Sequence, residues 1–192
     1  MNNNLLETIK SVEGKPLYLE YHQQRMENSL KSLGYSIRHD LSNLLHPPID
    51  GVYRCRVLYL QEIVKIEYFP YQLSPINSLK LVYCDNLDYS LKYENRDKLN
   101  NLFELRENCD DILIVKNSLL TDTSKANIAL YDGSQWFTPS TPLLQGTTRA
   151  RLLDEKKIFV KSLHVSDINN FSKVAVLNAM VDFCVLKDGI IA

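Results

Sequence analysis

The stretch Thr121-Asp122-Thr123-Ser124-Lys125-Ala126-Asn127-Ile128 contributes most to the prediction of the fold. Its polar residues stand between two short apolar runs, residues 112–116 and 128–131, which are typical of buried strands. The second run leads into Asp132-Gly133, a pair that favours a hairpin turn, and then into a further strand at 135–138. The chain therefore predicts short strands in its second half, with Asp122 ahead of the strand that Asn127 enters.

Helical spacing of apolar residues predicts few helices. It is found over residues 21–33, where Gly34 stands at the expected end of the helix, and over residues 95–108. Residues 41–46 suit either a short helix or a loop, and residues 149–153 suit a further helix.

Strand-like runs make up most of the remaining pattern. Further strands are predicted at residues 51–60, 62–69, 79–84, 158–163, 174–177 and 183–186. A loop-like stretch at 70–77 places a boundary between a small lobe, residues 1–76, and a larger lobe, residues 77–192. The expected fold class is α+β with two lobes.

Composition narrows the class of protein. A chain of 192 residues, 45% hydrophobic and 23% charged, suits one large globular domain or two small lobes. The formal net charge of −1 gives no reason to expect nucleic acid or an anionic membrane as a partner. Neither a bilayer-spanning apolar stretch nor the layout of a signal peptide is recognisable. We therefore expect a cytoplasmic protein.

Cysteine and histidine usage points away from metal chemistry. The four cysteines are scattered without a C-x-x-C pair, which indicates reduced thiols, and the four histidines are equally dispersed. No metal site is therefore expected.

Lys92 lies between a predicted strand and a predicted helix, in the run Tyr89-Ser90-Leu91-Lys92-Tyr93-Glu94-Asn95-Arg96. A lysine that forms a Schiff base with an aldehyde should be partly desolvated, because burial lowers the pKa of the amine and frees it to attack. The alternative is an ordinary surface lysine.

Asp122 is the second residue of chemical interest. A carboxylate that faces a pyridine nitrogen keeps that nitrogen protonated, so the ring can accept electrons from a substrate carbanion. The alternative is that Asp122 and Thr123 shape a turn, as such residues commonly do.

Two further segments suit a phosphate. Gly146-Thr147-Thr148 precedes the helix predicted at 149–153, and the amides of a helix start, helped by two hydroxyls, can bind an anion. Arg25 could add a fixed positive charge from the first helix. The alternatives are a threonine N-cap and a solvated helix face. Lysine, carboxylate and phosphate site in this order suit the aldehyde, ring nitrogen and phosphate of pyridoxal 5′-phosphate (PLP).

With these residues assembled, the chain resembles the class IV aminotransferase family, the fold-type IV PLP enzymes. The matching stretches run in the family's order: Glu7-Thr8-Ile9, residues 22–25, 91–99 and 120–131, Thr138-Pro139, residues 145–149 and Leu177-Asn178-Ala179-Met180. The resemblance implies a D-amino acid aminotransferase-like fold, a homodimer and PLP as the cofactor.

The resemblance also assigns roles to individual positions. It makes Lys92 the Schiff-base lysine, which also moves the proton, and places Asp122 opposite the pyridine nitrogen. Asn127 matches the asparagine that closes the same motif, and the resemblance counts it among the residues that bind the cofactor. The implied phosphate ligands are Arg25, Gly146, Thr147 and Thr148. Asn178 and Ala179 match a loop that borders cofactor and substrate.

Two departures from the family pattern accompany the match. Asp122 stands where the family usually has the longer glutamate, and the chain is expected to be shortened at its N-terminus, without the hairpin that precedes the Glu-Thr segment. The run 91–96 is most similar to the lyase branch, which converts 4-amino-4-deoxychorismate to 4-aminobenzoate and pyruvate in the folate pathway. The alternatives are an aminotransferase acting on branched-chain or D-amino acids, and a non-catalytic PLP-binding relative.

Overall fold

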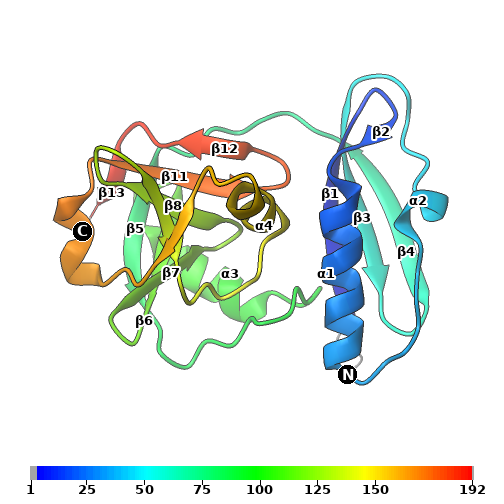
Figure 1. Ribbon diagram of the computed structural model, residues 1–192, viewed down its shortest axis with the longest axis horizontal. Coiled ribbons are helices and arrows are strands. Elements are labelled where there is room, and N and C mark those ends of the chain that lie inside the picture. Colours follow the sequence, from blue (N-terminus) through cyan, green and yellow to red (C-terminus); the bar gives the residue numbers. More distant parts are fainter. Residues whose placement is uncertain (1–3, 192) are drawn as a thin grey trace. The chain divides into compact units, whose positions relative to one another are not determined.

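The computed structural model describes residues 4–191, which divide into two compact units (Figure 1). The first unit comprises Met1–Leu73 and Leu91–Asn95, and the second comprises Ser74–Ser90 and Arg96–Ala192. The first division falls three residues before the expected boundary at residue 76. The expectation also placed Lys92 in the larger lobe, whereas the structure groups its segment with the first unit, because Leu6 N–H donates to the Lys92 carbonyl at 2.8 Å.

The first unit is built on a four-stranded antiparallel sheet in the order β2-β1-β3-β4. Its strands are β1 (Leu5–Val12), β2 (Lys15–Pro16), β3 (Val52–Tyr59) and β4 (Ile63–Pro70). The helices are α1 (Leu19–Ser32) and α2 (Leu41–Leu44). The strands predicted at 51–60 and 62–69 are thus found, whereas β1 was not expected.

Helix α1 covers the sheet through its apolar face. Met26 and Leu30 are buried against Leu5 and Ile9 of β1 in one hydrophobic core. The helix ends where the sequence indicated, because Gly34 adopts a left-handed φ of +81° and its N–H bonds the Lys31 carbonyl.

The second unit carries a nine-stranded mixed sheet. Its main path is β10-β9-β8-β7-β6-β5-β13, and β11 joins it by pairing with β8 and β12. The strands are β5 (Ser78–Tyr83), β6 (Asp111–Lys116), β7 (Leu119–Thr123), β8 (Asn127–Tyr131), β9 (Trp136–Pro139), β10 (Phe159–Lys161), β11 (Lys173–Asn178), β12 (Asp182–Val185) and β13 (Gly189–Ile191). The helices are α3 (Asp97–Phe103), α4 (Thr147–Asp154) and the 3-10 turns η1 (Glu104–Arg106) and η2 (Val165–Asn170).

Most predicted elements of the second unit are found within a few residues of their expected bounds. The Asp132-Gly133 hairpin joins β8 to β9 as expected, with Asp132 Oδ1 accepting from the backbone of Ser134 and Gln135 at 2.9 Å each. The helix expected at 95–108 is shorter and ends in η1. Strands β7 and β13 were not expected, so Asp122 lies inside a strand rather than in a loop before one.

Candidate active site

A buried carboxylate organises the polar residues of the first unit. Glu7 on β1 has no solvent exposure, and it accepts hydrogen bonds from His22 Nδ1 at 2.7 Å and from Arg25 Nε at 2.8 Å. Arg25 Nη2 donates to its other oxygen, so the guanidinium binds Glu7 through two parallel bonds. His22 and Arg25 are three residues apart on α1 and therefore share the helix face that covers the sheet.

Glu7 is ionised in this cluster, whereas His22 is neutral. Burial pushes the pKa of Glu7 upward, but the Arg25 charge and the hydrogen bonds from His22 and Arg25 outweigh it and bring the pKa to about 2. Burial lowers the pKa of His22, and the positive charges of Arg25 and Lys92 lower it further against the opposing effect of Glu7. His22 is thus neutral at physiological pH, and its Nδ1–H donates to the ionised Glu7.

Lys92 lies alongside this cluster. Besides the bond between Leu6 N–H and the Lys92 carbonyl, an antiparallel bridge joins Leu5 to Tyr93. These contacts place the backbone of Lys92 beside β1, one residue from the register of Glu7, and its charge acts on His22. Lys92 is half-buried.

Asp122 is the corresponding buried carboxylate of the second unit. It is 4% exposed on β7 and lies directly opposite Asn127 of β8. Its Oδ1 accepts from Asn127 Nδ2 at 2.8 Å and its Oδ2 from Leu144 N at 2.9 Å. Burial raises the pKa of Asp122 to about 6, although the bonds from Asn127 and Leu144 and the charge of Arg149 act in the opposite direction.

The segment after Leu144 leads into helix α4. Gly146 is the N-cap and supplies no side-chain cap, so the alternative of a threonine N-cap is wrong; Thr147 and Thr148 are the first two helical residues. Both are buried, and the amides at this end of an α-helix lack intrahelical partners. A glycine, two hydroxyls and a helix N-terminus together form a site suited to an anion.

The Arg149 side chain stabilises the start of helix α4 through three hydrogen bonds. The buried guanidinium donates to Thr138 Oγ1 at 3.3 Å, to the Pro139 carbonyl at 2.9 Å and to Gln145 Oε1 at 3.2 Å. It therefore ties the end of β9 to the residue that precedes Gly146. No sequence pattern predicted a role for Arg149, Glu7 or His22, although all three fall within the stretches that carry the family resemblance.

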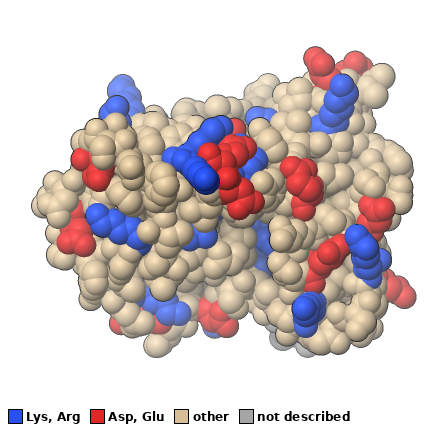
Figure 2. All heavy atoms as spheres, viewed as in Figure 1, with Lys and Arg blue, Asp and Glu red and all other residues tan. Residues whose placement is uncertain are grey.

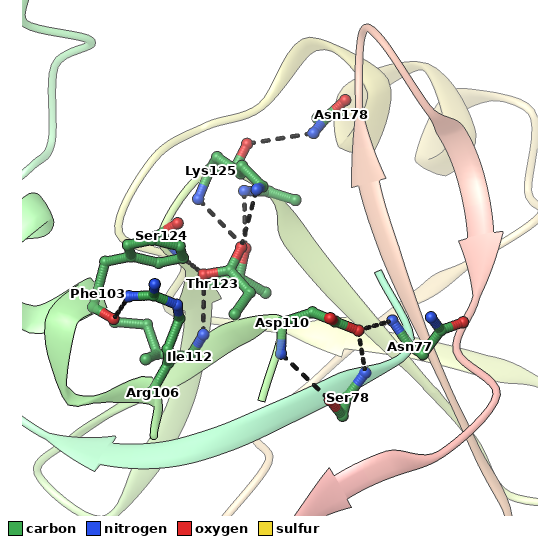
Figure 3. Close-up of polar contacts among 12 residues, drawn as sticks. Asn77, Ser78, Phe103, Arg106, Asp110, Ile112, Thr123, Ser124, Lys125 and Asn178 are labelled. Carbon is green, nitrogen blue, oxygen red and sulfur yellow. Dashed lines mark hydrogen bonds and ion pairs between the residues drawn. The ribbon is translucent and has the colours of Figure 1, made fainter. Parts of the chain in front are cut away.

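Asn178 and Ala179 follow the pairing of β11 with β8, in which Leu177 lies opposite Asn127. Asn178 Oδ1 accepts from Met180 N at 2.8 Å and Val181 N at 3.0 Å, which closes a turn. Its Nδ2 donates to the Lys125 carbonyl at 3.4 Å, as Figure 3 shows. Asn178 therefore borders the turn between β7 and β8.

Other parts of the surface are unremarkable in charge. Figure 2 shows acidic and basic side chains interspersed over the viewed face of the described residues. Among residues 4–191, no group of three or more His, Cys, Asp and Glu side chains could hold a metal ion. Within the same part of the chain, no helix is long and apolar enough to cross a membrane.

Known proteins share both sequence and fold with this chain. An uncharacterized protein of Haemophilus influenzae is 39% identical over 182 residues, which cover 92% of this chain and 97% of that protein. A Haemophilus somnus protein of known structure, provisionally named a 4-amino-4-deoxychorismate lyase, superposes with a TM-score of 0.87 at 36% identity, covering 94% of this chain and 97% of that one. The PLP-bound structure of a hypothetical aminotransferase from Mycobacterium tuberculosis shares the fold, with a TM-score of 0.78 at 14% identity over 98% of this chain and 81% of that one.

The fold is therefore that of the fold-type IV aminotransferases and lyases, and the α+β expectation is confirmed. Residues 91–185 match the family model for amino-transferase class IV. The chain belongs to the class IV aminotransferase family, as its motifs indicated.

Proposed function

We propose that this protein is a PLP-dependent lyase that converts 4-amino-4-deoxychorismate to 4-aminobenzoate and pyruvate. The observation that carries the cofactor assignment is the buried Asp122–Asn127 pair that leads through Leu144 to the glycine-started helix α4. In this arrangement Asp122 is the carboxylate for a ring nitrogen, and the start of helix α4 is the anion site for a phosphate.

The residues present fit the chemistry of PLP. Asp122 is buried and accepts from Asn127 Nδ2 and Leu144 N, and a carboxylate in this position suits a further donor such as a protonated ring nitrogen. Thr147, Thr148 and the amides after Gly146 suit a phosphate dianion. Arg25, whose guanidinium is fixed by Glu7, is a cation that the family resemblance assigns to a phosphate.

When bound, PLP supplies an electron-accepting ring that stabilises negative charge on a substrate carbon. In the first unit, Lys92 would bind the cofactor aldehyde through its amine, and as a free amine it would take the ring proton of the substrate. In the second unit, ionised Asp122 would keep the ring nitrogen protonated, and Asn178 and Ala179 would border the substrate. A proton on the ring nitrogen would lower the energy of the negative charge that develops on the substrate carbon during elimination.

Two observations favour the lyase reaction. The Haemophilus somnus protein that carries the provisional lyase name is 36% identical and is covered over 97% of its length. The run 91–96 is also most similar to the lyase branch of the family. By the same resemblance we propose a cytoplasmic homodimer that serves the folate pathway.

The absorption spectrum of the purified protein with added PLP tests the cofactor assignment. We expect a visible chromophore that borohydride reduces onto Lys92, located by peptide mapping. Lys92→Ala should abolish it, whereas Lys98→Ala, at an exposed lysine on α3, should not. A chromophore that persists in Lys92→Ala contradicts the assignment.

The reaction is tested on the protein loaded with PLP. We expect 4-amino-4-deoxychorismate to give 4-aminobenzoate and pyruvate in equal amounts. Conversion of the cofactor to its amine form by an amino acid, without 4-aminobenzoate formation, would instead identify an aminotransferase. Binding of PLP with neither reaction would identify a non-catalytic relative.

A further inference from the structure

Asn127 connects two parts of the second unit that are far apart in the sequence. Its Nδ2 donates to Asp122 Oδ1 at 2.8 Å and to the Leu144 carbonyl at 2.9 Å. An amide nitrogen carries two hydrogens, and these two bonds use both of them. The side chain is 4% exposed, so little of it faces solvent.

The other end of the Asn127 amide explains the glycine at position 146. A Cβ added to Gly146 would overlap Asn127 Oδ1 and lie 3.0 Å from Asn127 Cγ, and its three nearest neighbours all belong to Asn127. The backbone of Gly146 has φ −73° and ψ 143°, which any residue adopts. Glycine is therefore required here by the close approach of Asn127 and not by the backbone conformation.

The peptide groups before helix α4 are fixed from both sides. The N–H of Leu144 donates to Asp122 Oδ2 at 2.9 Å, while its carbonyl accepts from Asn127. The next residue, Gln145, accepts from Arg149 at 3.2 Å. The three residues that lead into the first amides of α4 are thus each in contact with a buried side chain.

We propose that Asn127 is a positioning residue, which couples the carboxylate for the ring nitrogen to the phosphate site at the start of α4. This inference rests on the proposed function, and it replaces the expectation that Asn127 binds the cofactor itself. Asn127 acts through Leu144 and Gly146, whose positions decide where the amides of Thr147 and Thr148 point. Its loss should therefore weaken recognition of the phosphate more than recognition of the ring.

Pyridoxal, which lacks the phosphate, separates these two contributions. The experiment measures the affinities of the wild-type protein and of Asn127→Ala for PLP and for pyridoxal. We expect the wild type to prefer PLP, and Asn127→Ala to lose roughly tenfold of that preference, which corresponds to about 1.4 kcal/mol. The matched control is Ser78→Ala, because Ser78 is also buried in the second unit and accepts from a backbone N–H, of Asp110, at 3.2 Å. It should lower thermal stability without changing the preference.

Gly146→Ala reaches the same contact without deleting a hydrogen-bonding group, so the single variant tests the coupling even if Asn127→Ala does not fold, and a full PLP preference in Gly146→Ala would overturn it. We expect Gly146→Ala to reduce the PLP preference in the wild type and to cost much less in the Asn127→Ala background, where the added methyl group has room. Equal losses in both backgrounds, or a full preference in Asn127→Ala, would overturn the coupling. Absence of a Lys92 chromophore in the wild type would overturn the proposed function as well. The chromophore therefore distinguishes failure of the proposed function from failure of the coupling alone.

Discussion

Glu7 on β1 accepts two parallel hydrogen bonds from one edge of the Arg25 guanidinium on α1, and it does so without any solvent exposure. A buried ion pair of this kind is expensive to break from one side, because the remaining charge stays desolvated and unpaired. The pair therefore fixes the orientation of Arg25 relative to the strand that Lys92 accompanies.

Glu7→Gln should destabilise the protein by about 3 kcal/mol, because it leaves the Arg25 charge without its carboxylate. Urea unfolding of the protein without cofactor measures the loss. The control is Glu67→Gln, whose carboxylate pairs with Arg56 and Lys65 on the sheet surface, and it should cost much less. Equal stabilities of the two variants would contradict the structural importance of the Glu7 pair.

The same carboxyl predicts an acid dependence of stability. Because the pKa of Glu7 falls from 4.5 in the unfolded chain to about 2 in the folded protein, its contribution is complete above pH 4.5 and is lost as the pH falls towards 2. The shift corresponds to about 3 kcal/mol. The difference in unfolding free energy between wild type and Glu7→Gln should therefore narrow below pH 4.5, and a difference that stays constant down to pH 2.5 would exclude this origin.

Asp122 predicts a pH dependence of the opposite sign. Its pKa is raised from 3.8 to about 6 by burial, so the folded protein without cofactor takes up a proton before the unfolded chain does. Lowering the pH from 7 to 5 should thus add about 1 kcal/mol of stability through this group. The difference in unfolding free energy between wild type and Asp122→Asn separates the contribution of Asp122 from that of His22. Asn127→Ala should shift the pH dependence of this difference to higher pH, because the bond from Asn127 lowers the pKa of Asp122. A wild-type curve parallel to that of Asp122→Asn would refute the prediction.

Arg149→Met should lower the free energy of unfolding by about 2 kcal/mol, because Thr138, Pro139 and Gln145 lose the donor that joins them. Arg149→Lys should recover little of this loss, since an ammonium group cannot match the planar fork. Thermal unfolding of both variants is compared with that of Arg38→Lys, at an exposed ion pair with Glu27. Full recovery by lysine would show that charge alone is needed.

Local chemistry explains which elements could be predicted from the sequence. Gly34 ends α1 through its own backbone conformation, and Asp132 forms its hairpin with the residues that follow directly. Such features depend only on neighbours along the chain. Strand β1 was not predicted, because its inward-facing positions include Glu7 and Ser11, whose polar side chains interrupt the apolar alternation.

The candidate site shows the same limit. The motif indicated Asp122, but not that the surrounding residues form strand β7, since the side chains of Thr121, Asp122 and Thr123 are polar and nevertheless buried. The role proposed for Asn127 depends on Leu144 and Gly146, which no local pattern brings near it. Partners supplied by tertiary structure were beyond the reach of spacing alone.

The grouping of Leu91–Asn95 with the first unit has a consequence for dissecting the protein. The polypeptide passes between the units at Leu73, at Ser90 and again at Asn95, so neither unit is one continuous piece of chain. A fragment that stops at Leu73 would lack the carbonyl that Leu6 bonds and the two apolar side chains, Leu91 and Tyr93, that pack on the core of that unit. Separate expression of residues 1–73 and 74–192 would therefore split the first unit. A fragment that contains the whole first unit needs residues 91–95 joined to residues 1–73 through a designed linker.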